Sequence, residues 1–217
     1  MLKRDYILTM VEQLGYVLAR VLFLKETRRF DVAEVEVQDF LGKIFGIGAR
    51  ALREAGEEQL HELCMEEGEF QPHRAVALAS LLKELGDIDS RRDDAQYEPC
   101  GSYERALLLL LDAYGEGRVA LPLDAVDTLE LMIERCAACG LGPSVQRRLL
   151  HHLELTGYYA DAEDLLYEML DAGTADRDRD AIPFYQRLLG RSDDDLLSGG
   201  LPREEVEEGM RSVRARE

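Results

Sequence analysis

Tryptophan is missing from this chain of 217 residues, and cysteine, histidine and proline are scarce. Aromatic side chains make up only 7% of the sequence. Long apolar runs are missing too: the longest, Ala106 to Leu111, is far shorter than the ~20 residues that a membrane-spanning helix needs. We therefore expect no membrane partner for this chain.

Positive charge is also in short supply. The formal net charge is −18, although 46% of the residues are apolar, which is enough for a packed core. Residues 1–53 carry a net charge of +2, and residues 54–217 carry −20. Nucleic acids are bound mainly through Lys and Arg that neutralise phosphates, so we expect no nucleic-acid partner. The acidic surface either keeps the chain soluble or faces a basic partner.

The cysteines and the first residues bear on the compartment. No signal-peptide cleavage pattern follows the opening Leu2-Lys3-Arg4-Asp5. Four cysteines in a chain of this length then indicate reduced thiols, because disulfides are rare in the cytosol. We therefore expect a cytoplasmic protein.

One short pattern appears twice, near opposite ends of the chain. Its steps of three, four and three put four side chains on one helical stripe, and its second member is an alanine that lets a neighbouring helix approach closely. The members are Phe30, Ala33, Val37 and Phe40 in the first copy, and Tyr159, Ala162, Leu166 and Met169 in the second. Each copy follows a turn and an earlier apolar helix, so the pattern predicts a helical hairpin near each end.

Apolar residues at helical spacing recur between these ends, separated by Gly and Pro, without any strand-like alternation. The pattern predicts an all-α fold of about eight to ten helices, packed as antiparallel pairs. Residues 87–101 are rich in charge, hold almost nothing apolar beyond Ile88 and Tyr97, and predict a linker or exposed loop. We therefore expect an N-terminal helical half at 1–86, a C-terminal half at 102–190, and an acidic, mixed-charge tail with a terminal helix at 191–217.

Part of the second hairpin resembles a tetratricopeptide repeat. The Gly, Tyr and Ala of that family fall on Gly157, Tyr159 and Ala162, and its later apolar positions fall on Leu166 and Met169. The resemblance implies an irregular tetratricopeptide-like stack of helix pairs.

Two further comparisons qualify that resemblance. In the first hairpin Arg28 stands where the tetratricopeptide family has glycine, so the match there is weaker. The opening residues 1–13 resemble an uncharacterised bacterial family of helical-repeat-like proteins, and the resemblance covers mainly the first forty residues. That family has no established activity, so the resemblance implies a bacterial protein and a helical fold but no reaction.

Two pairs of residues are candidate metal ligands. His61 and Cys64, with Cys136 and Cys139, would together supply an imidazole and three thiolates to zinc. The spacing within each pair is also one helical turn, and buried cysteines are common in helical cores. Since the pairs lie far apart in the sequence, we prefer core packing and expect no metal or cofactor. A redox role is disfavoured because Cys136 and Cys139 end their helix, where the dipole does not stabilise a thiolate.

A basic group stands out in the acidic half of the chain. It consists of Arg147, Arg148, His151 and His152. The tetratricopeptide resemblance places Arg147 and His151 one turn apart on the inner face of a repeat, where such residues clamp a terminal carboxylate. The alternative is that all four are solvated and pair with nearby acids.

The chain contains no nucleotide-binding loop, no GxSxG elbow and no HExxH pair, so we expect that it is not an enzyme. The expected function is a non-enzymatic scaffold or adaptor that binds a protein or peptide between its helices. One alternative is a structural, self-associating protein whose apolar N-terminal helix forms a homodimer. A second alternative is a zinc-binding or catalytic helical protein.

Overall fold

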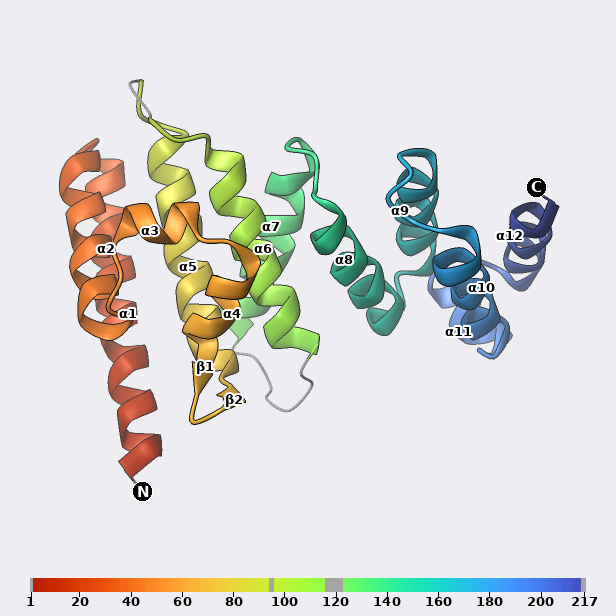
Figure 1. Cartoon of the computed structure of the whole chain (residues 1–217), viewed down its shortest axis with the longest axis horizontal. Helices are drawn as coiled ribbons and strands as arrows, with labels where there is room; N and C mark the ends of the chain where they lie inside the picture. Colours follow the sequence, from red (N-terminus) through yellow and green to blue (C-terminus); the bar gives the residue numbers. More distant parts are fainter. Residues whose placement is uncertain (1, 94–95, 116–122, 216–217) are drawn as a thin grey trace. The chain divides into compact units, whose positions relative to one another are not determined.

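The computed structural model describes residues 2–93, 96–115 and 123–215. These residues form twelve α-helices, one π-helical turn and two very short strands (Figure 1), so the predicted all-α class is confirmed. The helices outnumber the eight to ten predicted because α3 (Ala49–Glu54) and α11 (Asp193–Ser198) are too short to show a helical period. The chain divides into two compact units, Met1–Gly140 and Leu141–Glu217, and each is described by itself.

The first unit is centred on one helix, α5, which contacts every other helix described in that unit. Its elements are α1 (Leu2–Glu26), α2 (Phe30–Ile44), α3, α4 (Glu57–Cys64), β1 (Met65–Glu66), β2 (Glu69–Phe70), α5 (Pro72–Asp89), α6 (Pro99–Gly115) and α7 (Leu123–Ala137). Helices α1 and α2 form the predicted hairpin and pack on α5, as Figure 1 shows in red, orange and yellow.

The first predicted stripe lies in the core. Ala33 and Val37 are fully buried, Phe40 is buried and Phe30 is half-buried. Since α2 faces both α1 and α5, these side chains hold the hairpin on the central helix. The prediction of this stripe is therefore confirmed.

A small antiparallel hairpin, β1–β2, was not predicted. Met65 pairs with Phe70, and the two residues of the turn, Glu67 and Gly68, have φ of 54° and 83°. Two central residues with positive φ are what a tight hairpin turn requires. The sequence shows no alternation here because strands of two residues are too short for it.

The predicted linker at residues 87–101 is wrong as a boundary between halves. Helix α5 continues to Asp89, its last acids are buried, and α6 begins at Pro99 and packs along it. Residues 94–95 lie outside the described part of the chain. The division between units falls after Gly140 instead.

Cations from elsewhere in the unit explain how the acids of α5 can be buried. Lys25 Nζ donates to Asp87 Oδ2 at 2.8 Å and also pairs with Glu84. The Tyr103 hydroxyl donates to the other oxygen of Asp87 at 3.0 Å. Although burial acts to raise it, the pKa of Asp87 is held below its ordinary value by the hydrogen bond from Lys25 and the charge of Lys83. Buried charges are tolerated only when they are paired in this way.

A second buried pair fixes the end of α5. The guanidinium of Arg53, on α3, donates to both carboxylate oxygens of Asp89, at 2.8 and 2.9 Å. The ring of Tyr97 lies 4.7 Å from the same guanidinium. Bidentate pairing of this kind fixes orientation as well as charge, so it holds α3 against the end of α5.

The second unit has its own core. Its elements are α8 (Pro143–Thr156), α9 (Tyr159–Asp171), the π-helical turn η1 (Arg177–Ala181), α10 (Ile182–Leu189), α11 and α12 (Arg203–Ala215). All four members of the second predicted stripe are buried, which confirms that prediction. The predicted terminal helix is present as α12, but 191–217 is not a tail: Val206, Met210 and Val213 are buried, and the helix packs on α10 and α11.

Candidate functional site

Helix α1 exposes an unusual amount of apolar surface. Five of the nine large apolar side chains that are exposed in the described part of the chain lie on it. They are Leu8 (53% exposed), Val11 (49%), Tyr16 (70%), Leu22 (50%) and Phe23 (58%). Single exposed apolar residues are ordinary, but a concentration of them on one element marks an interaction surface.

The sequence of α1 explains this exposure. Met10, Leu14, Val21 and Leu24 form one buried face, which packs on α2 and α5. The helix is apolar beyond that face, so the additional side chains point to solvent. An amphipathic surface helix would carry polar residues there instead.

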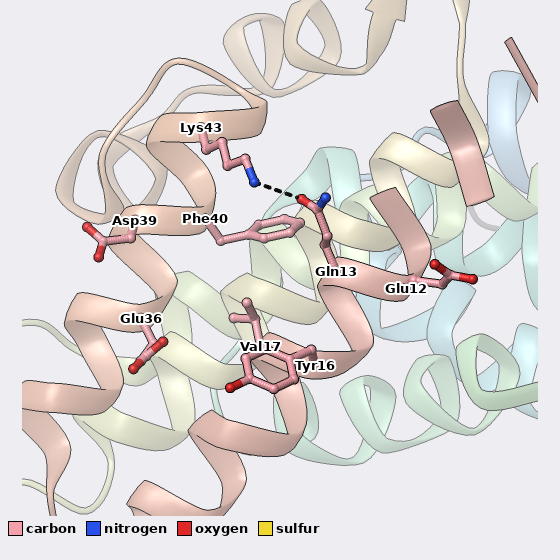
Figure 2. Close-up of a pocket in the computed structure, with 8 residues that line it drawn as sticks. All are labelled: Glu12, Gln13, Tyr16, Val17, Glu36, Asp39, Phe40 and Lys43. Atoms are coloured by element: carbon pink, nitrogen blue, oxygen red, sulfur yellow. Dashed lines mark hydrogen bonds between the residues drawn. The ribbon is translucent and has the colours of Figure 1, made fainter. Parts of the chain in front are cut away.

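An open groove lies between α1 and α2, with a cavity volume of about 400 Å³. We call it the α1–α2 groove. It is lined by Glu12, Gln13, Tyr16, Val17, Glu36, Asp39, Phe40 and Lys43 (Figure 2). In Figure 2, Phe40 points from α2 toward α1 above Val17 and Tyr16, whereas Glu12 and Asp39 point outward on opposite sides. The groove therefore has an apolar floor and a charged rim.

The rim is predominantly acidic. Lys43 Nζ donates across the groove to Gln13 Oε1 at 3.2 Å, and Glu36 pairs with Arg20. Among the residues that the structure describes, neither Glu12 nor Asp39 has an ion-pair partner. Two carboxylates on the rim are thus available to a cation from outside.

Helix α1 is also a candidate membrane span. From Ile7 to Glu26 it is long and apolar enough to cross a membrane, by length and composition alone. A mostly buried core helix and an N-terminal signal sequence pass the same test, and here 22% of the apolar window is buried, with one face of α1 packed on α2 and α5. Lys25 would also have to leave its buried pairs with Glu84 and Asp87, which is costly.

A second hollow, of about 770 Å³, is lined by Lys25, Glu26, Arg28, Phe30, Arg91, Arg92 and Asp93. Arg28 has the left-handed φ of 56° at the turn between α1 and α2. Two cations of this hollow already form ion pairs. Lys25, at the end of α1, pairs with Asp87 of α5, and Arg92 pairs with two carboxylates of α2. Because two of its four cations are already paired within the chain, we do not assign it a ligand.

Two of the four cysteines form a disulfide. It joins Cys100, near the start of α6, to Cys139, just after α7. The expectation of four reduced thiols is therefore wrong for this pair. The physical reason is that α6 and α7 pack against each other, which brings the start of one beside the end of the other.

The candidate zinc ligands do not assemble. Cys139 is taken up by the disulfide, and His61 stacks on Phe70. Cys64 and Cys136 are buried thiols, and burial raises the pKa of each to about 12. Within the described ranges, no three His, Cys, Asp or Glu side chains gather in a way that could hold a metal ion. In the described part of the chain these four residues are therefore not brought together as a zinc site.

The basic group of the second unit lies on α8. Arg147 and His151 are both exposed, and Arg147 Nη2 donates to the backbone carbonyl of Thr174 at 3.0 Å. Arg148 donates to the preceding turn of its own helix. His152 is half-buried, and burial together with the neighbouring His151 lowers its pKa. The clamp for a terminal carboxylate stays a prediction.

Sequence reasoning identified the apolar N-terminal helix but missed the groove beside it. Glu36, Asp39 and Lys43 look like an ordinary solvated face of α2, since nothing local shows that α1 lies next to them. The available signal was the excess of apolar residues on α1 over what one buried stripe needs.

The fold and this surface define an all-α protein that presents an apolar helix face and an acidic-rimmed groove on its first hairpin. The chain belongs to the family of unknown function DUF6483, whose model matches residues 1–217. No curated protein and no solved structure matches the chain. The tetratricopeptide resemblance gains no support from these comparisons and stays a prediction.

Proposed function

We propose that the chain is a non-enzymatic scaffold that binds a segment of another protein in the α1–α2 groove. The observation that carries this proposal is the make-up of the groove, an apolar floor of Val17 and Phe40 beneath an acidic rim. Recognition sites commonly combine apolar lining with a few polar groups that fix orientation. The exposed apolar surface of α1 extends the contact area beyond the groove.

The charge of the groove indicates the chemistry of the partner. An apolar side chain of the partner fits the floor, and a Lys or Arg fits the two unpaired carboxylates of Glu12 and Asp39. The net charge of −18 adds a long-range attraction for a basic segment. A membrane surface, which is usually anionic, is a poorer match.

The second unit supports the wider proposal of a tetratricopeptide-like scaffold. Gly157 ends α8 with a left-handed φ of 83°, which allows the sharp turn into α9. Tyr159 and Ala162 are then buried in the core of this unit, in which α9 packs on α8. Stacked hairpins of this kind suit protein binding, because their surfaces are long and modular.

The test is affinity purification from the native host, with mass spectrometry, on three forms of the full chain. They are the wild type, Asp39→Lys in the groove and Glu62→Lys, a matched charge reversal at an exposed position of α4. We expect at least one protein that the wild type and Glu62→Lys retain equally and that Asp39→Lys retains about tenfold less. A partner list that Asp39→Lys leaves unchanged would falsify the proposal.

A basic segment of that partner should then bind the purified chain directly. Its affinity should fall as the ionic strength rises, because exposed charges are screened within about 8 Å at physiological salt. Binding that is independent of salt and of Asp39→Lys would place the partner elsewhere on the surface.

A further inference from the structure

The side of α1 that faces away from α2 and α5 carries a continuous line of apolar and small residues, which we call the α1 outer strip. Its members are Leu8, Val11, Gly15, Ala19, Leu22 and Phe23. Steps of three and four place them along one side of the helix. Ala19 is exposed, the four large side chains are about half exposed, and a β-carbon at Gly15 would meet no atom within 4 Å. Nothing in the described part of the chain covers this strip.

We propose that a second copy of this chain covers the α1 outer strip, with the two α1 helices packed antiparallel and crossing between Gly15 and Ala19. This interface shares Glu12 with the rim of the α1–α2 groove, but it does not depend on the function proposed above. Small residues one turn apart let two helix axes approach to about 8 Å, the short end of the usual range. The crossing point is where such an approach is needed.

The large side chains lie on both sides of that crossing. Leu8 and Val11 precede it, and Leu22 and Phe23 follow it. In an antiparallel pair each end of the strip meets the opposite end of the other copy, so Val11 lies level with Leu22 and Phe23 of the other copy, and this happens twice. A two-fold interface requires a patch that is complementary to itself, and the strip meets this requirement.

Charge at the edge of the strip selects the antiparallel direction. Glu12 and Arg20 lie eight residues apart and flank the strip on the side toward α2. Antiparallel packing brings Glu12 of one copy within about one turn, ~5 Å along the axis, of Arg20 in the other copy. Parallel packing would place the Glu12 and Arg20 side chains of the two copies on opposite sides of the interface, and this pairing would be lost.

Arg20 can serve both contacts. Its Nε pairs with Glu36 in its own chain, and its side chain is still 45% exposed. The guanidinium has five N–H donors in total, so its remaining N–H groups are available to Glu12 of the other copy. The same two residues therefore complement each other twice across the two-fold axis.

The first test measures the mass of the full chain in solution over a range of concentrations, by sedimentation equilibrium or light scattering. We expect the wild type to approach twice its 24.5 kDa. Gly15→Leu should raise the dimer dissociation constant at least about tenfold, because its side chain fills the crossing point. The monomer should tolerate this change, since the position is open and Leu favours a helix more than Gly does.

Gly42→Leu is the matched control. Gly42 also lies within a helix and has no atom within 4 Å of its β-carbon position, but it is on α2. This variant should dimerise like the wild type. A wild type that remains monomeric, or a Gly15→Leu variant that dimerises as well as Gly42→Leu, overturns the proposal.

A charge exchange tests the direction of packing. Glu12→Arg and Arg20→Glu should each weaken the dimer, whereas the double variant should restore it, since the opposite charges again face each other. A double variant at least as weak as the worse single variant overturns the antiparallel arrangement. Asp39→Lys should leave the dimer intact, so failure of the groove proposal and failure of this one give different results.

Discussion

At the scale of single residues, the cysteines give the most direct check of the structure. Burial raises the pKa of Cys64 and Cys136 to about 12, so at pH 8 only about one thiol in 10⁴ is a thiolate. We expect neither to react with a thiol reagent in the native protein. After unfolding without reductant two thiols should react, and after reduction four. Four reactive thiols without reductant would show that Cys100 and Cys139 are not joined.

Asp87 offers a second residue-scale prediction. It is buried beside Lys25 and Tyr103, so Asp87→Asn leaves Lys25 with a poorer partner and should lower the free energy of unfolding by about 3–5 kcal/mol at pH 7. Its pKa is lowered in the folded state, so its contribution is present above the unfolded pKa and is lost as the pH falls through the folded value. The gap between wild type and variant should therefore narrow below about pH 4.

Denaturant titrations from pH 3 to pH 7 measure that gap. Glu54→Gln is the control, because Glu54 pairs with Arg50 in an exposed ion pair on α3. Such pairs contribute about 0.5 kcal/mol or less, so Glu54→Gln should hardly change the free energy of unfolding at any pH. Equal effects of the two substitutions would contradict the structural role assigned to Asp87.

At the scale of elements, two helical glycines should respond to alanine in opposite directions. A β-carbon at Gly209 of α12 would collide with the ring and hydroxyl of Tyr185, whereas one at Gly42 of α2 would meet no atom within 4 Å. Alanine gains about 1 kcal/mol of helix propensity over glycine at either site. At Gly209 overpacking of about 1–3 kcal/mol should outweigh that gain. Thermal unfolding should show a lower midpoint for Gly209→Ala and a slightly higher one for Gly42→Ala.

The elements also show what a sequence can reveal and what it cannot. The stripes of α2 and α9 were predictable because their information is local, one residue every three or four along a single helix. The end of α5 was not: Asp87 and Asp89 look like a solvated linker until partners 62 and 36 residues away neutralise them. The disulfide, across 39 residues, and the groove are likewise properties of packing between helices.

At the scale of the whole molecule, the division after Gly140 leads us to expect that the second unit can fold by itself. The core of the second unit is closed within residues 141–217, from Tyr159 on α9 to Val213 on α12. Arg187 and Glu154 add a bidentate ion pair inside the same unit, with distances of 2.6 and 2.7 Å. A fragment of this size has enough core to fold alone, with a stability of about 4–10 kcal/mol.

We therefore expect the fragment 141–217 to be helical by circular dichroism and to unfold in one cooperative transition on heating. Introducing Gly209→Ala into the fragment is the internal control, because the clash with Tyr185 lies wholly inside it. The substitution should lower the midpoint of the fragment about as much as it lowers that of the same unit in the full chain. The fragment could instead be unfolded at low temperature, or its unfolding midpoint could be unchanged by Gly209→Ala. Either result would mean that its core depends on the first unit for its stability.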